Sequence, residues 1–193
     1  MNYKNPDYIL PLLSQAEMAY VMLFSLCNNG YFDLDEEEFI GSSVSDDDEP
    51  SSEFDFTWSV KDPDGEPFMI TISGSFSGYT TEGSAGSYWD PPEAGDTYID
   101  SLDVGMIYIQ TPETDFEVTK EMVEKEGFSY KDMILMAEKA AYIEIEYDFT
   151  KYITDRMKTA PTGIPRELEE KMEKLDNDPI LKKRYLARKI GLL

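Results

Sequence analysis

Hydrophobic and polar residues alternate over two stretches, 54–60 and 68–76, and this pattern predicts two half-buried β-strands. The residues between them, Asp62-Pro63-Asp64-Gly65, are typical of a tight turn, because proline presets φ and glycine accepts a positive φ. We therefore expect a hairpin. Two more strands are predicted over 98–110 and 115–119, which completes an antiparallel meander of four strands. On the third strand we expect one face to carry Leu102, Val104, Met106 and Tyr108.

A mainly apolar stretch near the N-terminus predicts a helix from residue 14 to residue 28. Ser14 and Glu17 have the spacing of a capping box, in which each side chain satisfies a free backbone N–H of the first turn. Most positions from Met18 to Leu26 are apolar, so this helix has almost no polar face. Such a helix is buried on most sides or forms half of an interface. We favour burial in the protein's own core.

Helical patterns also follow the strands. Ser129 begins a predicted helix whose apolar residues repeat at helical spacing. From residue 142 to 150 the pattern alternates as in a strand but contains no helix breaker; we favour a helix, and the strand is the alternative. Two proline-led helices are predicted near 165–175 and 179–190, the second capped by Asp178.

These elements predict an α+β fold, in which a four-stranded antiparallel meander is packed by an N-terminal and a central helix and a C-terminal helical pair follows. We divide the chain into an N-terminal core helix (1–30), an acidic flexible segment (31–53), a β-meander plus helix core (54–158), and a linker with the C-terminal helices (159–193). Within the acidic segment, residues 33–40 are expected to form at most a short turn of helix.

Charge is distributed unevenly along the chain. The 193 residues hold 40 Asp and Glu against 17 Lys and Arg, a net charge of -23. Residues 1–110 account for -20 of this and residues 111–193 for only -3. A surface this negative repels phosphate backbones, so we expect no direct binding to nucleic acid. The uninterrupted apolar run from Met18 to Phe24 is too short to cross a bilayer, and we expect a soluble protein without a membrane partner.

The composition also argues against common catalytic chemistry. The chain has no histidine and only one cysteine, Cys27, so it lacks a Ser-His or Cys-His pair, a His-ligated zinc and an intrachain disulfide. The acids near Asp33 lack the glycine and the spaced glutamate of a calcium loop, and Gly83-Ser84-Ala85-Gly86 lacks the Lys-Ser/Thr of a phosphate-binding loop. We therefore expect no catalytic residues, no metal and no cofactor.

Three groups of residues are candidates for partner binding. The first is an acidic surface consisting of Asp33, Asp35, Glu36, Glu37, Glu38, Asp46, Asp47, Asp48, Glu49, Asp96, Asp100, Asp103, Glu113, Asp115 and Glu117. The second is an aromatic pair in a proline-stiffened loop, Tyr88 and Trp89. The alternative is that these two side chains bind no partner but pack against the sheet and hold the loop in place. The third is a basic tail of Lys182, Lys183, Arg184, Arg188 and Lys189.

The loop between the second and third strands also carries a resemblance. The order Gly74-Ser75-Phe76-Ser77-Gly78-Tyr79, then Gly86-Ser87-Tyr88-Trp89-Asp90-Pro91-Pro92-Glu93, then Asp115-Phe116-Glu117-Val118-Thr119 resembles a group of small proteins from tailed-bacteriophage genomes that has no agreed activity. The resemblance covers about residues 54–150. It implies a phage protein in the cytoplasm of a bacterial host or associated with the virion, and it transfers no catalytic residues.

The leading hypothesis is a non-enzymatic interaction protein that presents negative charge to a basic partner, as a DNA-mimic-like inhibitor of a host nucleic-acid-handling or defence protein would. The alternative is a small phage structural or assembly protein that forms homo-oligomers through the apolar first helix, with the basic tail docked on the acidic segment of a neighbour. A third interpretation is an α+β domain whose acidity serves solubility alone.

Overall fold

The computed structural model describes residues 9–28, 35–41, 51–61, 67–84, 86, 95–145 and 147–189. In chain order the elements are a 3-10 turn η1 (Leu10–Leu12), α1 (Gln15–Asn28), β1 (Asp35–Gly41), β2 (Ser51–Lys61), β3 (Pro67–Thr80), β4 (Thr97–Gln110), β5 (Asp115–Glu117), α2 (Lys120–Lys125), α3 (Tyr130–Glu144), β6 (Asp148–Phe149), α4 (Lys151–Met157), α5 (Arg166–Asp176) and α6 (Pro179–Lys189).

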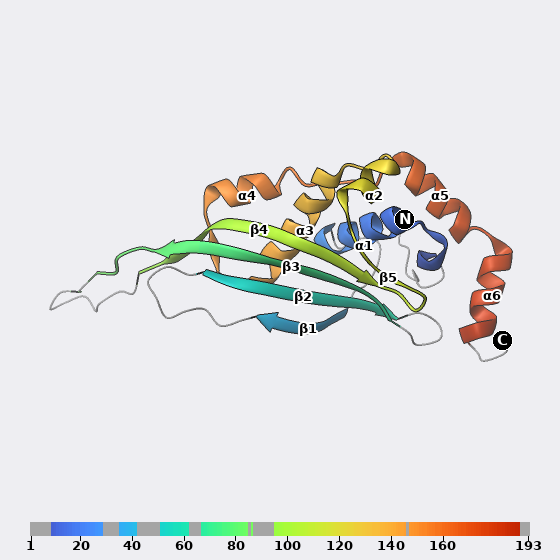
Figure 1. Ribbon diagram of the computed structural model, residues 1–193, viewed down its shortest axis with the longest axis horizontal. Coiled ribbons are helices and arrows are strands. Elements are labelled where there is room, and N and C mark those ends of the chain that lie inside the picture. The colour runs from blue at the N-terminus through green and yellow to red at the C-terminus, as the bar shows by residue number, and fades with distance from the viewer. Residues whose placement is uncertain are drawn as a thin grey trace.

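A six-stranded sheet forms the centre of the fold (Figure 1). Strands β1 to β5 are antiparallel neighbours in chain order, and β6 pairs in parallel with β4. The α+β class is as predicted and the β2–β3 hairpin is confirmed. The sheet is not, however, the four-stranded antiparallel meander that the sequence predicted. It has two additional strands, β1 before the predicted meander and β6 after it, and β6 is parallel to its neighbour β4.

The first additional strand is β1, which lies where we expected an exposed acidic segment with a turn of helix. Its residues Asp35–Gly41 pair with β2, and the register sets Phe39 opposite Phe56. Acidic residues have low strand propensity, but pairing with the edge of an existing sheet overrides this weak local preference. Residues 42–50 and the predicted turn at 62–65 lie outside the described residues.

The second additional strand is β6, in the segment 142–150 where we favoured a helix. Helix α3 ends at Glu144, and Ile145 adopts an extended conformation and is buried. Phe149 then pairs with Ile99 of β4 and contacts the ring of Tyr142 at a centroid distance of 4.4 Å. The helix that we favoured therefore continues only to Glu144, and the strand alternative holds at Asp148–Phe149, where pairing with the sheet edge outweighs helix continuation.

Strand β4 contains two bulges that change which residues face the core. The register with β3 shifts between Ser101 and Ile99 and again between Met106 and Val104. Each bulge inserts one residue and reverses the alternation. The core-facing residues of β4 are consequently Ile99, Leu102, Val104, Ile107 and Ile109. The predicted face of Leu102, Val104, Met106 and Tyr108 is wrong for its last two members, since Met106 is 40% exposed.

Two glycines of β3 make room for these bulges. Gly78 lies opposite Ile99, and a Cβ there would stand 2.0 Å from the carbonyl oxygen of Tyr98. Gly74 lies opposite Val104, and its Cβ would stand 2.2 Å from the carbonyl oxygen of Asp103. Both positions require a residue without a side chain, because the bulged backbone approaches too closely for any other.

The helices cover one face of the sheet and share a single core with it (Figure 1). The capping box of α1 is confirmed: the amide of Ser14 donates to Glu17 Oε2 at 2.8 Å, and the amide of Glu17 donates to Ser14 Oγ at 3.3 Å. Ten of the fourteen residues of α1 are buried, including every residue from Met18 to Ser25. Burial in the protein's own core is thus confirmed, and Leu26 is the one large apolar side chain of α1 that is only partly buried.

The C-terminal helices differ from each other in how they contact the rest of the protein. Helix α5 inserts Leu168 and Met172 into the main core. Helix α6 packs against α5 and carries two largely exposed apolar side chains, Ile180 (63%) and Leu186 (56%). The carboxylate of Asp178 accepts a hydrogen bond from the amide of Ile180 at 2.8 Å, which confirms the predicted cap.

Candidate functional site

The face of the sheet opposite the helices collects acidic side chains from three strands. Glu53 and Asp55 of β2 alternate with the buried Phe54 and Phe56, so they point away from the core. Glu53 lies opposite Ser75 of β3, which in turn lies opposite Asp103 of β4. In the neighbouring row, Asp55 lies opposite Ser73, which lies opposite Met106. On β5, Asp115 and Glu117 lie opposite Gln110 and Tyr108, which have the same outward direction. We call Glu53, Asp55, Asp103, Asp115 and Glu117 the acidic sheet face.

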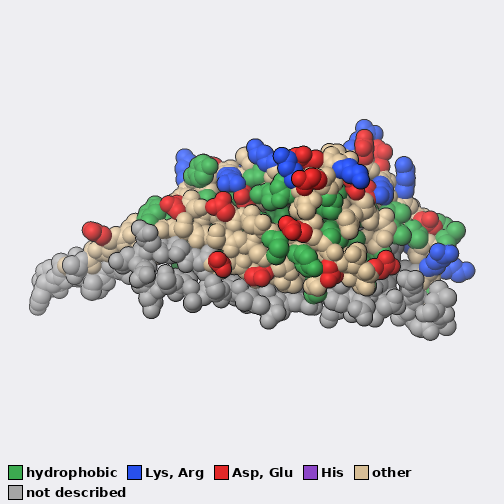
Figure 2. All heavy atoms as spheres, viewed as in Figure 1, with side chains coloured by type: hydrophobic (Ala, Val, Ile, Leu, Met, Phe, Trp, Pro, Cys, Tyr) green, Lys and Arg blue, Asp and Glu red, His purple; other side chains and the backbone are tan. Residues whose placement is uncertain are grey.

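The basic side chains that the structure describes lie elsewhere on the molecule. Figure 2 shows Lys and Arg along the border formed by the helices and at the C-terminal end, whereas the area over the strands shows Asp and Glu alone among the charged residues. Among the outward sheet positions whose side chains the structure describes, none is Lys or Arg. The outward side chains of the sheet that the structure describes therefore carry charge of a single sign, although the whole surface is mixed.

The acidic sheet face is hollowed where β4 bulges. A depression of about 530 Å³ is lined by Glu53, Asp55 and Asp103 together with Ser73, Ser75 and the backbone around Gly105. Its carboxylates are held by hydroxyl groups: Ser73 Oγ donates to Asp55 Oδ1 at 3.3 Å, and Ser101 Oγ donates to Asp103 Oδ2 at 3.0 Å. A hydroxyl partner orients a carboxylate without supplying an opposite charge, and it leaves further acceptor sites on the carboxylate oxygens unused.

Two tyrosines of β4 lie near acidic side chains at the ends of the sheet's third and fourth strand pairing. The carboxylate of Asp96, followed by partial burial, raises the pKa of Tyr98 above its usual value. Partial burial, followed by the carboxylate of Asp115, likewise raises the pKa of Tyr108. A nearby negative charge disfavours the phenolate, so both rings remain neutral hydrogen-bond donors at physiological pH.

The structure brings together only some of the predicted acidic residues. Asp103, Asp115 and Glu117 belong to the acidic sheet face. Asp96 precedes β4, Asp100 lies at its first bulge and Glu113 lies in the turn before β5; all three are exposed, but they are not part of the paired outward rows. The side chains of Asp35, Glu36, Glu37 and Glu38 on β1 are not described. Asp33, Asp46, Asp47, Asp48, Glu49 and the aromatic pair Tyr88 and Trp89 lie outside the described residues.

Glu53 and Asp55 are missing from the predicted surface, although the sequence contained the signal for them. Both alternate with aromatic residues that were correctly predicted to be buried. The alternation that placed Phe54 and Phe56 in the core therefore also placed their neighbours on the outward face.

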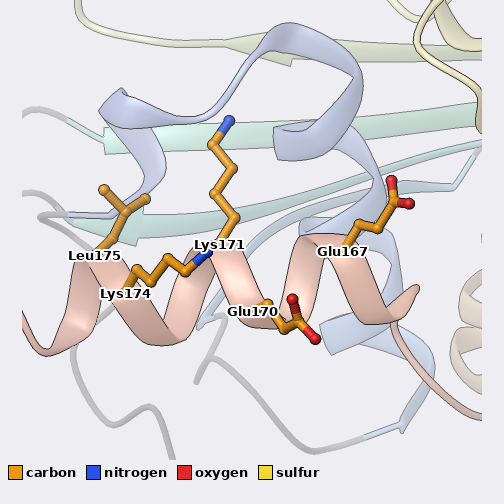
Figure 3. Close-up of a pocket in the computed structure, with 5 residues that line it drawn as sticks. All are labelled: Glu167, Glu170, Lys171, Lys174 and Leu175. Carbon is orange, nitrogen blue, oxygen red and sulfur yellow. The ribbon is translucent and has the colours of Figure 1, made fainter.

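The helical side offers a different kind of surface. Figure 3 shows a hollow of about 470 Å³ along α5, lined by Glu167, Glu170, Lys171, Lys174 and Leu175. Lys171 points from α5 towards α1, where its Nζ lies 2.5 Å from Glu17 Oε2. Acids and bases alternate here and neutralise one another, so this hollow has no strong preference for a ligand of either sign.

A buried ion pair lies between α3 and α4. Glu138 is 1% exposed, and its Oε1 accepts a hydrogen bond from Arg156 Nη2 at 2.5 Å. Its Oε2 has no hydrogen-bond partner among the described residues. Burial raises the pKa of Glu138, and the Arg156 guanidinium only partly offsets this. None of the hollows described above includes Glu138, so the pair connects two helices rather than forming a binding site.

The basic tail is presented on α6. Lys182, Lys183 and Arg184 are exposed, and Lys182 Nζ lies 3.8 Å from Asp176 Oδ2. Arg188 and Lys189 belong to the same helix, although their side chains are not described. Within the described residues, no group of three or more Asp, Glu or Cys side chains is arranged to hold a metal ion. In the same part of the chain, no helix is both long enough and apolar enough to span a bilayer.

Comparison with protein-family models, with curated proteins and with solved structures gives no match for this chain. The function must therefore be argued from the charge and geometry of the acidic sheet face.

Proposed function

We propose that the protein is a non-enzymatic binding protein whose acidic sheet face docks on a basic surface of a partner. The observation that carries this proposal is that a rigid, hydrogen-bonded sheet displays carboxylates on three strands, with no Lys or Arg among the outward side chains that the structure describes. An acidity that served solubility alone would require only dispersed charge, with both signs interspersed.

A sheet is well suited to imitating a phosphate array. Outward residues of one strand repeat at about 7 Å and adjacent strands lie about 4.8 Å apart. Carboxylates on β2, β4 and β5 are thereby held at fixed separations in two dimensions, which a flexible acidic segment cannot do. Duplex DNA carries one negative charge per ~1.7 Å of axis, and a protein that binds it has lysines and arginines placed for a regular array.

The partner that fits this face is a nucleic-acid-handling protein. In the bacteriophage setting implied by the sequence resemblance, it would be a host protein that handles DNA or defends against phage. The acidic sheet face would occupy its nucleic-acid site and exclude the natural ligand. Electrostatic attraction of this kind accelerates association and falls steeply with salt.

The test is a pull-down from nuclease-treated bacterial lysate at low and high salt, followed by competition of the purified protein with labelled duplex DNA for the captured partner. The informative variant combines Asp55→Asn, Asp103→Asn and Glu117→Gln. The matched control removes the same charge from exposed helical positions with Glu121→Gln, Glu167→Gln and Glu169→Gln.

We expect the wild type and the control to displace the duplex and the sheet-face variant to be about tenfold weaker, since each exposed charge pair contributes up to ~1 kcal/mol. Recovery of no nucleic-acid-binding protein at either salt concentration would contradict the proposal. Equal competition by the sheet-face variant would also contradict it.

A further inference from the structure

Helix α6 is a basic element that the rest of its own chain leaves uncovered. It packs against α5 at the end of the molecule and extends past the end of the sheet (Figure 1). Ile180, Lys183 and Arg184 are exposed and stand at i, i+3 and i+4, so they lie on one side of the helix. We call these three residues the α6 stripe.

The two bases of the α6 stripe differ in their ion pairing from the base next to them. Among the described residues, neither Lys183 nor Arg184 forms an ion pair, whereas the adjacent Lys182 lies 3.8 Å from Asp176. Ile180, 63% exposed, lies between the two bases on the helix surface. An uncovered stripe with two bases around one apolar residue fits a surface that combines carboxylates with apolar groups.

The acidic sheet face is a surface of this kind. Asp55, Asp103 and Glu117 form no ion pair with a described Lys or Arg. Beside them, Met106 of β4 is 40% exposed, and Met106 also lines the depression that holds Asp55 and Asp103. The carboxylates can therefore pair with the two bases of the α6 stripe, and Met106 can contact its apolar residue.

We infer that the α6 stripe of one copy docks on the acidic sheet face of a second copy, in a head-to-tail contact. The helix is short enough to lie on the sheet, because an 11-residue helix is about 16 Å long and the 14-residue β4 spans about 45 Å. The two surfaces differ from each other, so the contact is heterologous and leaves a free tail and a free face at the ends of each assembly. The inference rests on the proposed function only in that both use the acidic sheet face.

The contact is weak, because one short helix covers less than the area of a standard interface. The copies also carry like net charges, -23 each. At about 0.15 M salt the Debye length of about 8 Å screens repulsion between the bodies of the two copies, while ion pairs at the contact are screened less. Self-association should therefore be measured near this ionic strength over a wide concentration range.

The test uses charge reversal on each side of the contact and sedimentation velocity as the readout. The tail variant carries Lys183→Glu and Arg184→Glu. The face variant carries Asp55→Lys, Asp103→Lys and Glu117→Lys. A double-swap variant carries all five changes, which leaves its net charge within two units of the wild type. The control reverses helical acids with Glu121→Lys, Glu167→Lys and Glu169→Lys. Circular dichroism checks that every variant is folded.

We expect concentration-dependent association of the wild type and the control, its loss in the tail and face variants, and its recovery in the double-swap variant. A wild type that stays monomeric, a tail variant that still associates, or a double-swap variant that does not recover would each overturn the inference. Binding of the monomeric wild type to vesicles of anionic lipid, lost in the tail variant, would assign α6 to a membrane instead.

The same variants separate this inference from the proposed function. The tail variant has an intact acidic sheet face and should still displace DNA from the captured partner. If it does so while the wild type is monomeric, only the self-association is wrong. If the wild type self-associates through α6 but captures no nucleic-acid-binding protein, only the proposed function is wrong.

Discussion

The two sides of this protein use acidic residues in opposite ways. On the helical side acids face bases, as in Lys120–Glu124, Lys158–Asp155 and Arg166–Glu170. On the sheet side Asp55 and Asp103 face the hydroxyls of serine. A base cancels the charge of a carboxylate, whereas a hydroxyl only orients it. Acid content therefore does not predict where a protein is electrostatically negative; the partner of each acid does.

The difference has a structural origin. Apart from α1, the helical layer is built from residues 111–193, where bases nearly balance acids, and helical spacing sets opposite charges three or four residues apart. The sheet comes mainly from residues 1–110, where Lys4 and Lys61 are the only bases. The outward acids of β2, β4 and β5 therefore have few bases to pair with. Four predictions test this contrast, from the largest expected effect to the smallest.

The largest effect should come from the glycine that lets the sheet bulge. In Gly78→Ala the new Cβ would stand 2.0 Å from the carbonyl oxygen of Tyr98, so the backbone of β3 or β4 must move. We expect a loss of about 3 kcal/mol in the free energy of unfolding and a fall in Tm of about 6–12 °C. Thermal denaturation followed by circular dichroism measures both.

Gly105→Ala is the matched control, since its nearest neighbour, the carbonyl oxygen of Ser73, lies at an ordinary 3.7 Å. It should cost well under 1 kcal/mol. Equal destabilisation by the two substitutions would show that the bulges do not depend on close backbone approach at Gly78.

The second effect concerns the buried ion pair of the helical side. Arg156→Met leaves the carboxylate of Glu138 buried without a counter-charge, and Arg156 is itself about one third exposed. We expect a loss of about 2–3 kcal/mol at pH 7, below the range for a fully buried pair. The cost should shrink in acid, where Glu138 is protonated and needs no cation. Urea denaturation at pH 7 and pH 5 gives both values.

Glu138→Gln isolates the pH dependence. Burial raises the pKa of Glu138 in the folded protein, so the folded state binds this proton more tightly than the unfolded state. That stabilisation is complete below the unfolded pKa and is lost as the pH rises through the folded pKa. The wild type should therefore lose stability relative to Glu138→Gln as the pH rises from about 4.5. A stability difference that is independent of pH would contradict the raised pKa.

The third effect, with the opposite pH dependence, comes from Glu17. Burial alone would raise its pKa, but hydrogen bonds from Lys171 and Ser14 outweigh burial and lower the pKa. A lowered folded pKa gives stability that is present above the unfolded pKa and lost as the pH falls through the folded value. Glu17→Gln should cost about 1 kcal/mol at pH 7 and less at pH 3.5, measured by urea denaturation. A cost that is larger at pH 3.5 would contradict this assignment.

Much of this architecture was predictable from local patterns, and the exceptions share one cause. Alternation identified β2, β3 and their buried aromatics, and the Ser14–Glu17 spacing identified the start of α1. Strand β1 was missed because it exists through pairing with β2 rather than through its own propensity. Strand β6, which pairs with the distant β4, was only the alternative to a helix. The face of β4 was mispredicted because bulges break the period of two, although Gly74 and Gly78 marked the strand opposite them.

The same distinction applies to the candidate site. Asp103, Asp115 and Glu117 were found because acids on predicted strands stood out. Glu53 and Asp55 had the same alternation but were left out of the predicted acidic surface. The Glu138–Arg156 pair joins residues from two helices, and nothing in the local sequence marks it. Predictions from a single sequence therefore succeed where one strand or helix contains the whole signal.

The smallest effect tests the contrast between the sheet side and the helical side, because neutralising acids should change the stability in opposite directions on the two sides. Neutralising Asp55, Asp103 and Glu117 removes mutual repulsion and no ion pair with a described base, so this variant should gain about 0.5 kcal/mol in stability at low salt. Neutralising Glu124, Asp155 and Glu170 removes three ion pairs of the helical side and should lose about 0.5–1 kcal/mol. Urea denaturation of both variants beside the wild type measures the two differences.

High salt is the control for both stability differences, because dissolved ions screen the interactions between exposed charges. At 1 M salt the Debye length falls to about 3 Å, and both differences should approach zero. A sheet-face variant that is less stable than the wild type at low salt would mean that these carboxylates form stabilising contacts within the chain. The acidic sheet face would then be part of the fold's own stability, and its charge would no longer be free for a partner.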